Sequence, residues 1–224
     1  MAGAMNNEYE IFAKKRRVNQ IVFGVFFIAL IIAGWKYAII GYFIPLCMLI
    51  GIGMSLFKGR KWCDWYCPRG SFYDAIVRPV SPRRHIPSIF KNTVFRAGVI
   101  LILMAVMITN IIVLWPSFEK IGKFFVIMLT STTFVGIVLA LIFHQRIWCL
   151  MCPIGTMSSW LGKNKYPLKI DSKLCVDCKI CGKVCPIEIE PYKFKNSPKK
   201  TVQDADCLKC ASCVNICPKK ALKF

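Results

Sequence analysis

Four long apolar runs restrict the folds that this 224-residue chain can adopt. They cover residues 18–35, 38–57, 93–115 and 124–143. Each run holds about 20 mostly apolar residues, the length that a helix needs to cross a bilayer core of roughly 30 Å. A soluble bundle of four such helices would leave wide apolar faces in water. The sequence therefore predicts an α-helical membrane protein with four transmembrane helices.

The distribution of basic residues predicts the orientation of these helices. The formal net charge is +20, and the basic residues gather before the first run, between the second and third runs, and after the fourth run. The positive-inside rule then places both termini and the middle loop in the cytoplasm of a prokaryotic cell. No nucleic-acid-binding motif accompanies the charge, so we expect a membrane protein without a nucleic-acid partner.

The membrane part contains an internal repeat. Residues 57–63 and residues 143–149 both read F-x-x-R-x-W-C, and both continue to a second cysteine that is followed by Pro-x-Gly. Each half is therefore predicted to be a helical hairpin that ends in a cysteine–proline loop, at residues 62–70 and 148–155. Two such halves in the same orientation indicate a pseudo-twofold axis along the membrane normal.

A change of composition at about residue 162 predicts the domain boundaries. The apolar runs stop there, and residues 162–167 read as a short polar linker. We expect a basic cytoplasmic N-terminus at residues 1–17, a four-helix membrane domain at 18–162 and a small α+β ferredoxin-like domain at 163–224. The last part is too short for a large apolar core, so metal sites must stabilise it.

The tail carries two cysteine runs of the form C-x2-C-x2-C-x3-C, each followed by proline. This is the spacing of bacterial two-cluster ferredoxins, in which the fourth cysteine of each run binds the other cluster. The alternative, structural zinc, normally uses two C-x2-C pairs separated by a longer loop. The spacing therefore predicts two [4Fe–4S] clusters and single-electron transfer. The predicted ligands are Cys175, Cys178, Cys181 and Cys217 for the first cluster, and Cys207, Cys210, Cys213 and Cys185 for the second cluster.

Four further cysteines lie in the two cysteine–proline loops, as the pairs Cys63/Cys67 and Cys149/Cys152. Spacings of four and three place each pair on one face of a helix, if the helix is continuous. Three interpretations stay open: a third cluster or another metal shared by all four cysteines, a redox-active thiol pair, or structural contact with the tail. The remaining cysteine, Cys47, is predicted to be a packing residue inside the second helix.

Two other features allow more than one interpretation. His144 could relay protons near a quinone, or could be a solvated residue at the level of the lipid headgroups. Residues 163–224 contain 14 Lys and six acidic residues, a formal charge of +8. Two clusters of about −2 each would reduce this to roughly +4. Such a tail could lie on anionic lipids or dock an acidic redox partner.

The F-x-x-R-x-W-C loops and the cysteine-rich tail together resemble the membrane-bound polyferredoxins of the NapH type, with NosR-type and CcoG-type proteins as relatives. The resemblance extends from the first apolar run to Cys217. It implies four helices, cytoplasmic clusters, and electron exchange with a quinone pool or partner subunits, including a soluble iron–sulfur or flavin protein. The second loop departs from the usual C-x3-C-P by one residue, so the two loops need not do the same work.

The sequence thus predicts an electron-transfer subunit of an oxidoreductase complex. It has no nucleotide-binding motif and no catalytic triad, so we expect no catalysis by the chain alone. A maturation factor that supplies electrons for the assembly of a metalloenzyme is the main alternative. A structural anchor that tethers a soluble enzyme is a weaker one.

Overall fold

The structure is a computed structural model that describes residues 2–82 and 84–224. Within these residues, four helical stretches are long and apolar enough to cross a membrane. They are α1 (Ala2–Lys36), η1 (Ala38–Tyr42) continued by α2 (Phe43–Lys58), α5 (Thr93–Leu114) and α6 (Phe118–Ile142). The prediction of four membrane-length helices is confirmed, although α6 begins six residues before the predicted run.

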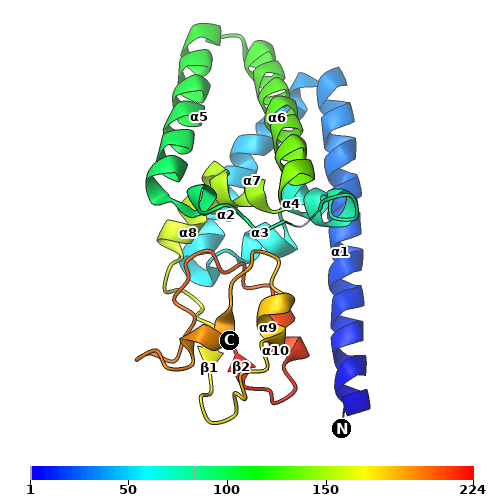
Figure 1. Ribbon diagram of the computed structural model, residues 1–224. Coiled ribbons are helices and arrows are strands. Elements are labelled where there is room, and N and C mark those ends of the chain that lie inside the picture. Colours follow the sequence, from blue (N-terminus) through cyan, green and yellow to red (C-terminus); the bar gives the residue numbers. More distant parts are fainter. Residues whose placement is uncertain (1, 83) are drawn as a thin grey trace.

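Helix α1 is longer than the apolar run that predicted it. It passes without a break through residues 2–17 of the basic segment, because no proline interrupts residues 2–36. Its N-terminal half extends beyond the other long helices and lies beside the tail (Figure 1). The salt bridge between Glu8 and Lys220, at 3.6 Å, joins these two parts of the chain.

Each cysteine–proline loop folds into a five-residue helix followed by a second helix that begins with proline. The first loop forms α3 (Lys61–Trp65), α4 (Pro68–Phe72) and the π-helical turn η2 (Tyr73–Val77). The second loop forms α7 (Ile147–Met151) and α8 (Pro153–Leu161). A further turn, η3 (Ser88–Lys91), leads into α5.

Each cysteine pair is divided by a helix boundary. Cys63 and Cys149 lie within α3 and α7, whereas Cys67 and Cys152 are the N-cap residues of α4 and α8. The expectation that each pair lies on one face of a continuous helix is therefore wrong. The next residue is proline in both loops, and proline is favoured at the first position of a new helix, where its missing N–H is not needed.

The tail is a small unit with little regular structure. Its strands β1 (Lys169–Ile170) and β2 (Leu222–Lys223) pair antiparallel, with Ile170 opposite Leu222. Its helical turns are α9 (Ile180–Lys183), η4 (Pro191–Phe194) and α10 (Ser212–Ile216). The residues that cap α9 and α10, Lys179 and Ala211, both have left-handed backbone angles, with φ of 62° and 65°. The same left-handed turn thus occurs in both cysteine runs and lets each three-cysteine loop curve tightly.

The apolar core of the tail continues into the membrane part. Buried residues such as Leu168, Ile187 and Leu208 pack with the tail cysteines, and Cys63 of the first loop belongs to the same cluster of buried side chains. A second core surrounds Tyr73 and Trp148. The first cysteine–proline loop is therefore in direct contact with the cysteine-rich tail.

Candidate iron–sulfur sites

The tail contains two small apolar cavities, and each is lined by four cysteines. One cavity is lined by Cys175, Cys178, Cys181 and Cys217. The other is lined by Cys185, Cys207, Cys210 and Cys213. In both cavities the fourth cysteine comes from the opposite run, as the interleaved ferredoxin pattern requires. The cysteines therefore fit two clusters with exchanged fourth ligands.

The chemistry of these thiols also fits bound iron. Burial raises the pKa of the Cys210 thiol to about 11 and that of the Cys185 thiol to about 12. A buried thiolate is stable only beside positive charge, and cluster ligands are thiolates. When bound, a [4Fe–4S] cluster supplies reversible one-electron chemistry at such a site. Cys178 is exposed whereas Cys210 is buried, so the first cavity is the one nearer to the tail surface.

The four cysteines of the cysteine–proline loops gather at one place. Burial, and then repulsion from the neighbouring Cys63, Cys149 and Cys152, raises the pKa of the Cys67 thiol. Burial raises the pKa of the Cys63 thiol to about 11, although the adjacent Arg60 guanidinium acts in the opposite direction. Cys67 and Cys152 line one cavity, and Arg146 Nη1 bonds to the Cys63 carbonyl and lies 3.7 Å from the Cys149 sulfur, so the structure brings together the four cysteines that the repeat singled out.

The two arginines of the F-x-x-R-x-W-C repeat cross over between the loops. Arg60 Nη2 donates a hydrogen bond to the carbonyl of Cys149 at 2.6 Å, and Arg146 Nη1 donates one to the carbonyl of Cys63 at 3.0 Å. Arg146 Nη1 also lies 3.7 Å from the Cys149 sulfur. Both arginines are almost fully buried. Each loop therefore holds the first cysteine of the other loop, which supports the internal repeat.

The glycines of the two Pro-x-Gly segments make this crossing possible. A Cβ atom on Gly70 would lie 2.6 Å from the carbonyl oxygen of Cys63, and one on Gly155 would lie 2.3 Å from that of Cys149. The guanidinium that binds each carbonyl is within 3.2 Å of the same position. Both glycines are thus required for the close approach of backbone and arginine, rather than for an unusual backbone angle.

A buried charge network surrounds Arg146. Its guanidinium bonds to Asp74 and lies 3.1 Å from an oxygen of Asp64, and Arg16 of α1 bonds to both carboxylates. Burial acts to raise the pKa of Asp74, but the Arg146 and Arg16 guanidiniums lower it below its ordinary value. The network ties α1 to the first loop. No sequence motif singled out Asp64 or Asp74.

Arg60 takes its carboxylate partner from the tail. Asp206, which precedes Cys207, lies 2.7 Å from Arg60 Nη1 and 2.7 Å from Arg96 Nη2, and accepts a hydrogen bond from Ser159 at 3.0 Å. Burial acts to raise the pKa of Asp206, but Arg60 and Arg96 lower it. Sequence reasoning missed Asp206, because no pattern near it indicates partners more than 100 residues away.

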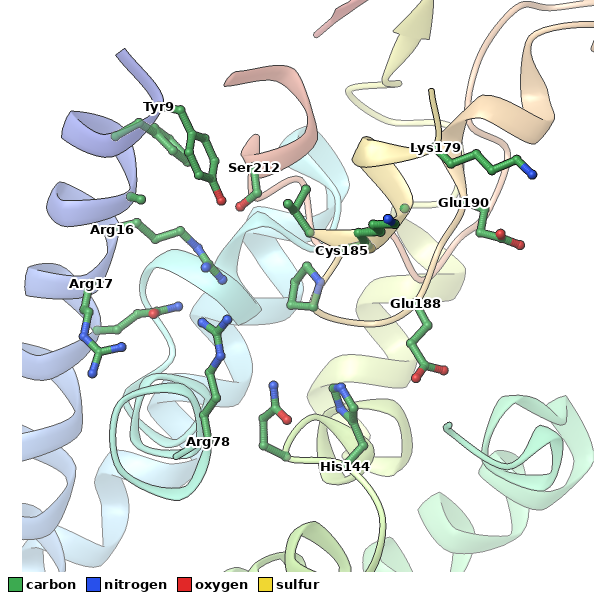
Figure 2. A pocket seen from close by; sticks show the side chains of 18 of the residues that line it. Tyr9, Arg16, Arg17, Arg78, His144, Lys179, Cys185, Glu188, Glu190 and Ser212 are labelled. Carbon is green, nitrogen blue, oxygen red and sulfur yellow. The ribbon is translucent and has the colours of Figure 1, made fainter. Parts of the chain in front are cut away.

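A polar cleft of about 850 Å³ lies between α1, Arg78 and His85 of the middle loop, the start of the second loop and the tail. Figure 2 shows Arg16, Arg17 and Arg78 on one side of it, with Cys185 and Glu188 on the other. His144 lines the inner end of the cleft and is buried, and its Nδ1 accepts the N–H of Arg146 at 3.2 Å. The prediction of a solvated His144 is therefore wrong, because residues 144–150 are all buried where the second loop turns inward.

Iron–sulfur families match most of the cysteine-bearing part of the chain. A family described as a 4Fe-4S binding domain matches residues 40–87 and again residues 126–173. A family described as a 4Fe-4S dicluster domain matches residues 167–218. The first family includes both cysteine–proline loops, and the second includes both tail runs.

Curated relatives point to one group of proteins. The ferredoxin-type protein NapH of Haemophilus influenzae is 26% identical over 190 residues, which cover 79% of this chain and 66% of that protein. The chain is a homologue of the NapH-type polyferredoxins. An uncharacterized protein of Methanocaldococcus jannaschii is 25% identical over 93% of the chain and 85% of its own length. YccM of Escherichia coli, whose name describes an electron transport protein, is 24% identical over 77% of the chain and 53% of its own length.

No solved structure gives a significant match to this polyferredoxin homologue. Its 4Fe-4S domains and its electron-transport relatives agree with the redox role that the tail cysteines predicted.

Proposed function

We propose that the chain is a membrane-bound electron-transfer subunit. It passes electrons between a soluble redox partner on the cytoplasmic side and a quinone pool or a membrane redox complex. The observation that carries the proposal is the composition of the two tail cavities, because each is lined by the four cysteines of one predicted ligand set. The ligands are Cys175, Cys178, Cys181 and Cys217 for one [4Fe–4S] cluster, and Cys185, Cys207, Cys210 and Cys213 for the other.

A third cluster at the membrane edge belongs to this proposal. Its ligands are Cys63, Cys67, Cys149 and Cys152. Two observations favour a cluster over a thiol pair or a packing role. Cys67 and Cys152 line one cavity, and Arg60 and Arg146 hold the main chain of Cys149 and Cys63 beside them. The Arg146 guanidinium also lies 3.7 Å from the Cys149 sulfur, where it would stabilise a thiolate ligand.

The positions of the three sites imply an order of electron transfer. Cys178 of the first tail set is exposed, which suits exchange with a soluble partner. Cys210 of the second set is buried close to the first cysteine–proline loop, because burial and then the Asp64 carboxylate of α3 raise the pKa of its thiol. Electrons would therefore pass between the partner, the first tail cluster, the second tail cluster and the membrane-edge cluster, in either direction.

The far end of this path needs a carrier within the bilayer. All three sites lie at one end of the long helices (Figure 1), and a bilayer core of roughly 30 Å is too thick for one tunnelling step. A quinone can serve, because it takes up two electrons and two protons on reduction. The clusters would deliver or remove these electrons one at a time, and the protons would exchange with cytoplasmic water.

Iron and sulfide analysis with EPR spectroscopy of the reduced protein tests the proposal. We expect about twelve irons per chain in anaerobically purified protein, four for each cubane. The double variant C67S/C152S should lose about four irons, and the control C47S should lose none. About eight irons in the wild type would remove the third cluster from the proposal. Zinc in place of iron would overturn the proposal entirely.

A further inference from the structure

An apolar cavity inside the helix bundle borders the membrane-edge cysteines. All four long helices contribute to its lining, through residues such as Leu30, Met48, Leu103 and Met128. Cys67 and Cys152 also line it, as does Cys47, the predicted packing residue. A molecule in this cavity would therefore be in contact with two of the four thiols proposed to hold the third cluster.

The lining contains one charged side chain, Arg69. Its guanidinium lies over the ring of Trp148, 4.5 Å from the ring centroid, and faces Tyr73 at 6.0 Å. Within the described residues, no salt bridge forms at Arg69. Its guanidinium interacts with the Tyr73 hydroxyl, but its buried Nε and Nη2 atoms have no hydrogen-bond partner. The other buried arginines of this region, Arg60 and Arg146, are both paired with carboxylates.

A second unpaired donor lies in the same lining. Trp148 is 5% exposed, and its Nε1 atom is buried with no acceptor among the described residues. A buried donor without a partner costs about 1–3 kcal/mol, and more when it is charged. Both unpaired groups donate, so a ligand that satisfies them must present acceptor oxygen at the head of an otherwise apolar molecule.

We propose that this cavity binds the ring of a lipid-soluble quinone, with Arg69 as the donor to a quinone carbonyl. The inference rests on the proposed electron-transfer function and gives it a site. The chemistry of the lining selects a quinone over a phospholipid. A carbonyl oxygen needs only one or two donors, whereas a charged phosphodiester needs more than one cation in so apolar a place.

The repeat provides a mild substitution for the test. The residue that corresponds to Arg69 in the second loop is Ile154, which also lines the cavity. Arg69→Ile therefore introduces a side chain that the matching loop already carries. Leu103→Trp is an independent variant that fills the cavity and leaves Arg69 in place. Lys58→Ile is the control. This substitution also removes one positive charge, but Lys58 is exposed at the end of α2 and does not line the cavity.

The experiment measures binding of a short-chain quinone, decylubiquinone, to the oxidised protein in nanodiscs by quenching of tryptophan fluorescence. We expect Arg69→Ile to weaken binding by about 10- to 100-fold, as for the loss of a charged donor. Leu103→Trp should abolish binding, and Lys58→Ile should bind like the wild type. Iron content, measured in parallel, identifies any variant that has failed to fold.

Wild-type affinity in both Arg69→Ile and Leu103→Trp would overturn the proposal. So would a wild-type protein that binds no quinone but retains a phospholipid that Arg69→Ile releases, as measured by native mass spectrometry. Binding to the oxidised protein needs no electron transfer. Absence of cluster EPR signals from the wild-type protein would therefore contradict the proposed function alone. Quinone binding that stays unchanged in Arg69→Ile and Leu103→Trp would contradict only this binding site.

Discussion

Arg60 donates a 2.6 Å hydrogen bond to the main-chain carbonyl of Cys149, which lies 89 residues further along the chain. Arg146 makes the corresponding bond to the carbonyl of Cys63, 83 residues before it. Neither cysteine loop can reach its final conformation without the other. The membrane-edge site is thus built from two halves of the chain that fix each other's position.

Replacement of Arg146 should severely destabilise the protein. In Arg146→Leu, Asp64 and Asp74 keep the salt bridges to Arg16, and Asp74 keeps the hydrogen bond from Gln20, but the fully buried cation between them is lost. Breaking a buried ion pair in this way costs about 3–5 kcal/mol. We expect a clearly lower unfolding temperature in detergent and loss of iron from the membrane-edge site. The exposed Arg84 provides the control, and Arg84→Leu should unfold like the wild type. Equal unfolding temperatures for the two variants would contradict the network.

Alanine at Gly155 should disrupt the second loop. Its Cβ would lie 2.3 Å from the Cys149 carbonyl and 3.0 Å from Arg60 Nη2, so the backbone or the arginine must move. Gly98 of α5 is the matched control, since no atom lies within 4 Å of its Cβ position. Gly98→Ala should be neutral or stabilise by up to about 1 kcal/mol. Unfolding temperature and iron content are measured for both variants. Equal values for Gly155→Ala and Gly98→Ala would contradict the close approach of Gly155 to the Cys149 carbonyl.

Serine substitution of the fourth cysteine of each run tests whether the two tail clusters exchange their fourth ligands. Cys217→Ser should alter the cluster proposed for Cys175, Cys178 and Cys181, although Cys217 belongs to the other run. Cys185→Ser should alter the cluster nearer to the membrane part. Each variant should lose about four irons and one of the two tail EPR signals. If Cys217→Ser removes the signal that Cys210→Ser also removes, the ligand assignment is wrong.

Asp206→Asn should loosen the tail from the membrane part. The carboxylate connects Arg60, Arg96 and Ser159, and an amide cannot compensate two buried guanidiniums. We expect residues 162–167 to be cut faster by protease, with both tail clusters retained. The exposed Asp171 is the control, and Asp171→Asn should be cut at the wild-type rate.

The lowered pKa of Asp206 predicts how the docking of the tail depends on pH. A carboxylate whose pKa is lower in the folded state contributes stability above its unfolded value of about 4, and loses it as the pH falls through the lowered value. The protease resistance of residues 162–167 should therefore be the same at pH 5.5 and pH 8. A decrease between these two values would show that another group controls docking.

The sequence predicted the parts of this fold that depend on local pattern. Apolar run length located the four long helices, since each run must cover a bilayer by itself. The cysteine spacing predicted the residues that line each tail cavity, because three ligands of a cluster lie on one tight loop and the interleaved pattern takes the fourth from the other run. The repeated motif marked Arg60 and Arg146, but their carbonyl partners could not be predicted, since these depend on how the two loops pack.

The features that were missed depend on contacts between distant segments. Asp206 pairs with Arg60 and Arg96 across the boundary between tail and membrane part, and nothing in its own segment signals this. A solvated position was one of the two interpretations of His144, yet the second loop folds inward and buries it. Arg69 differs from its repeat counterpart Ile154, and this difference was the available signal for its special place in the lining.

The uninterrupted helix α1 has a mechanical consequence. Its 35 residues make a rod about 52 Å long, and that rod is fixed through Arg16 to the first loop and packs against α10 of the tail. A tilt of this rod in the lipid would carry the tail with it. The spacing between redox centres, on which tunnelling rates depend steeply, would then stay constant while the surrounding bilayer fluctuates.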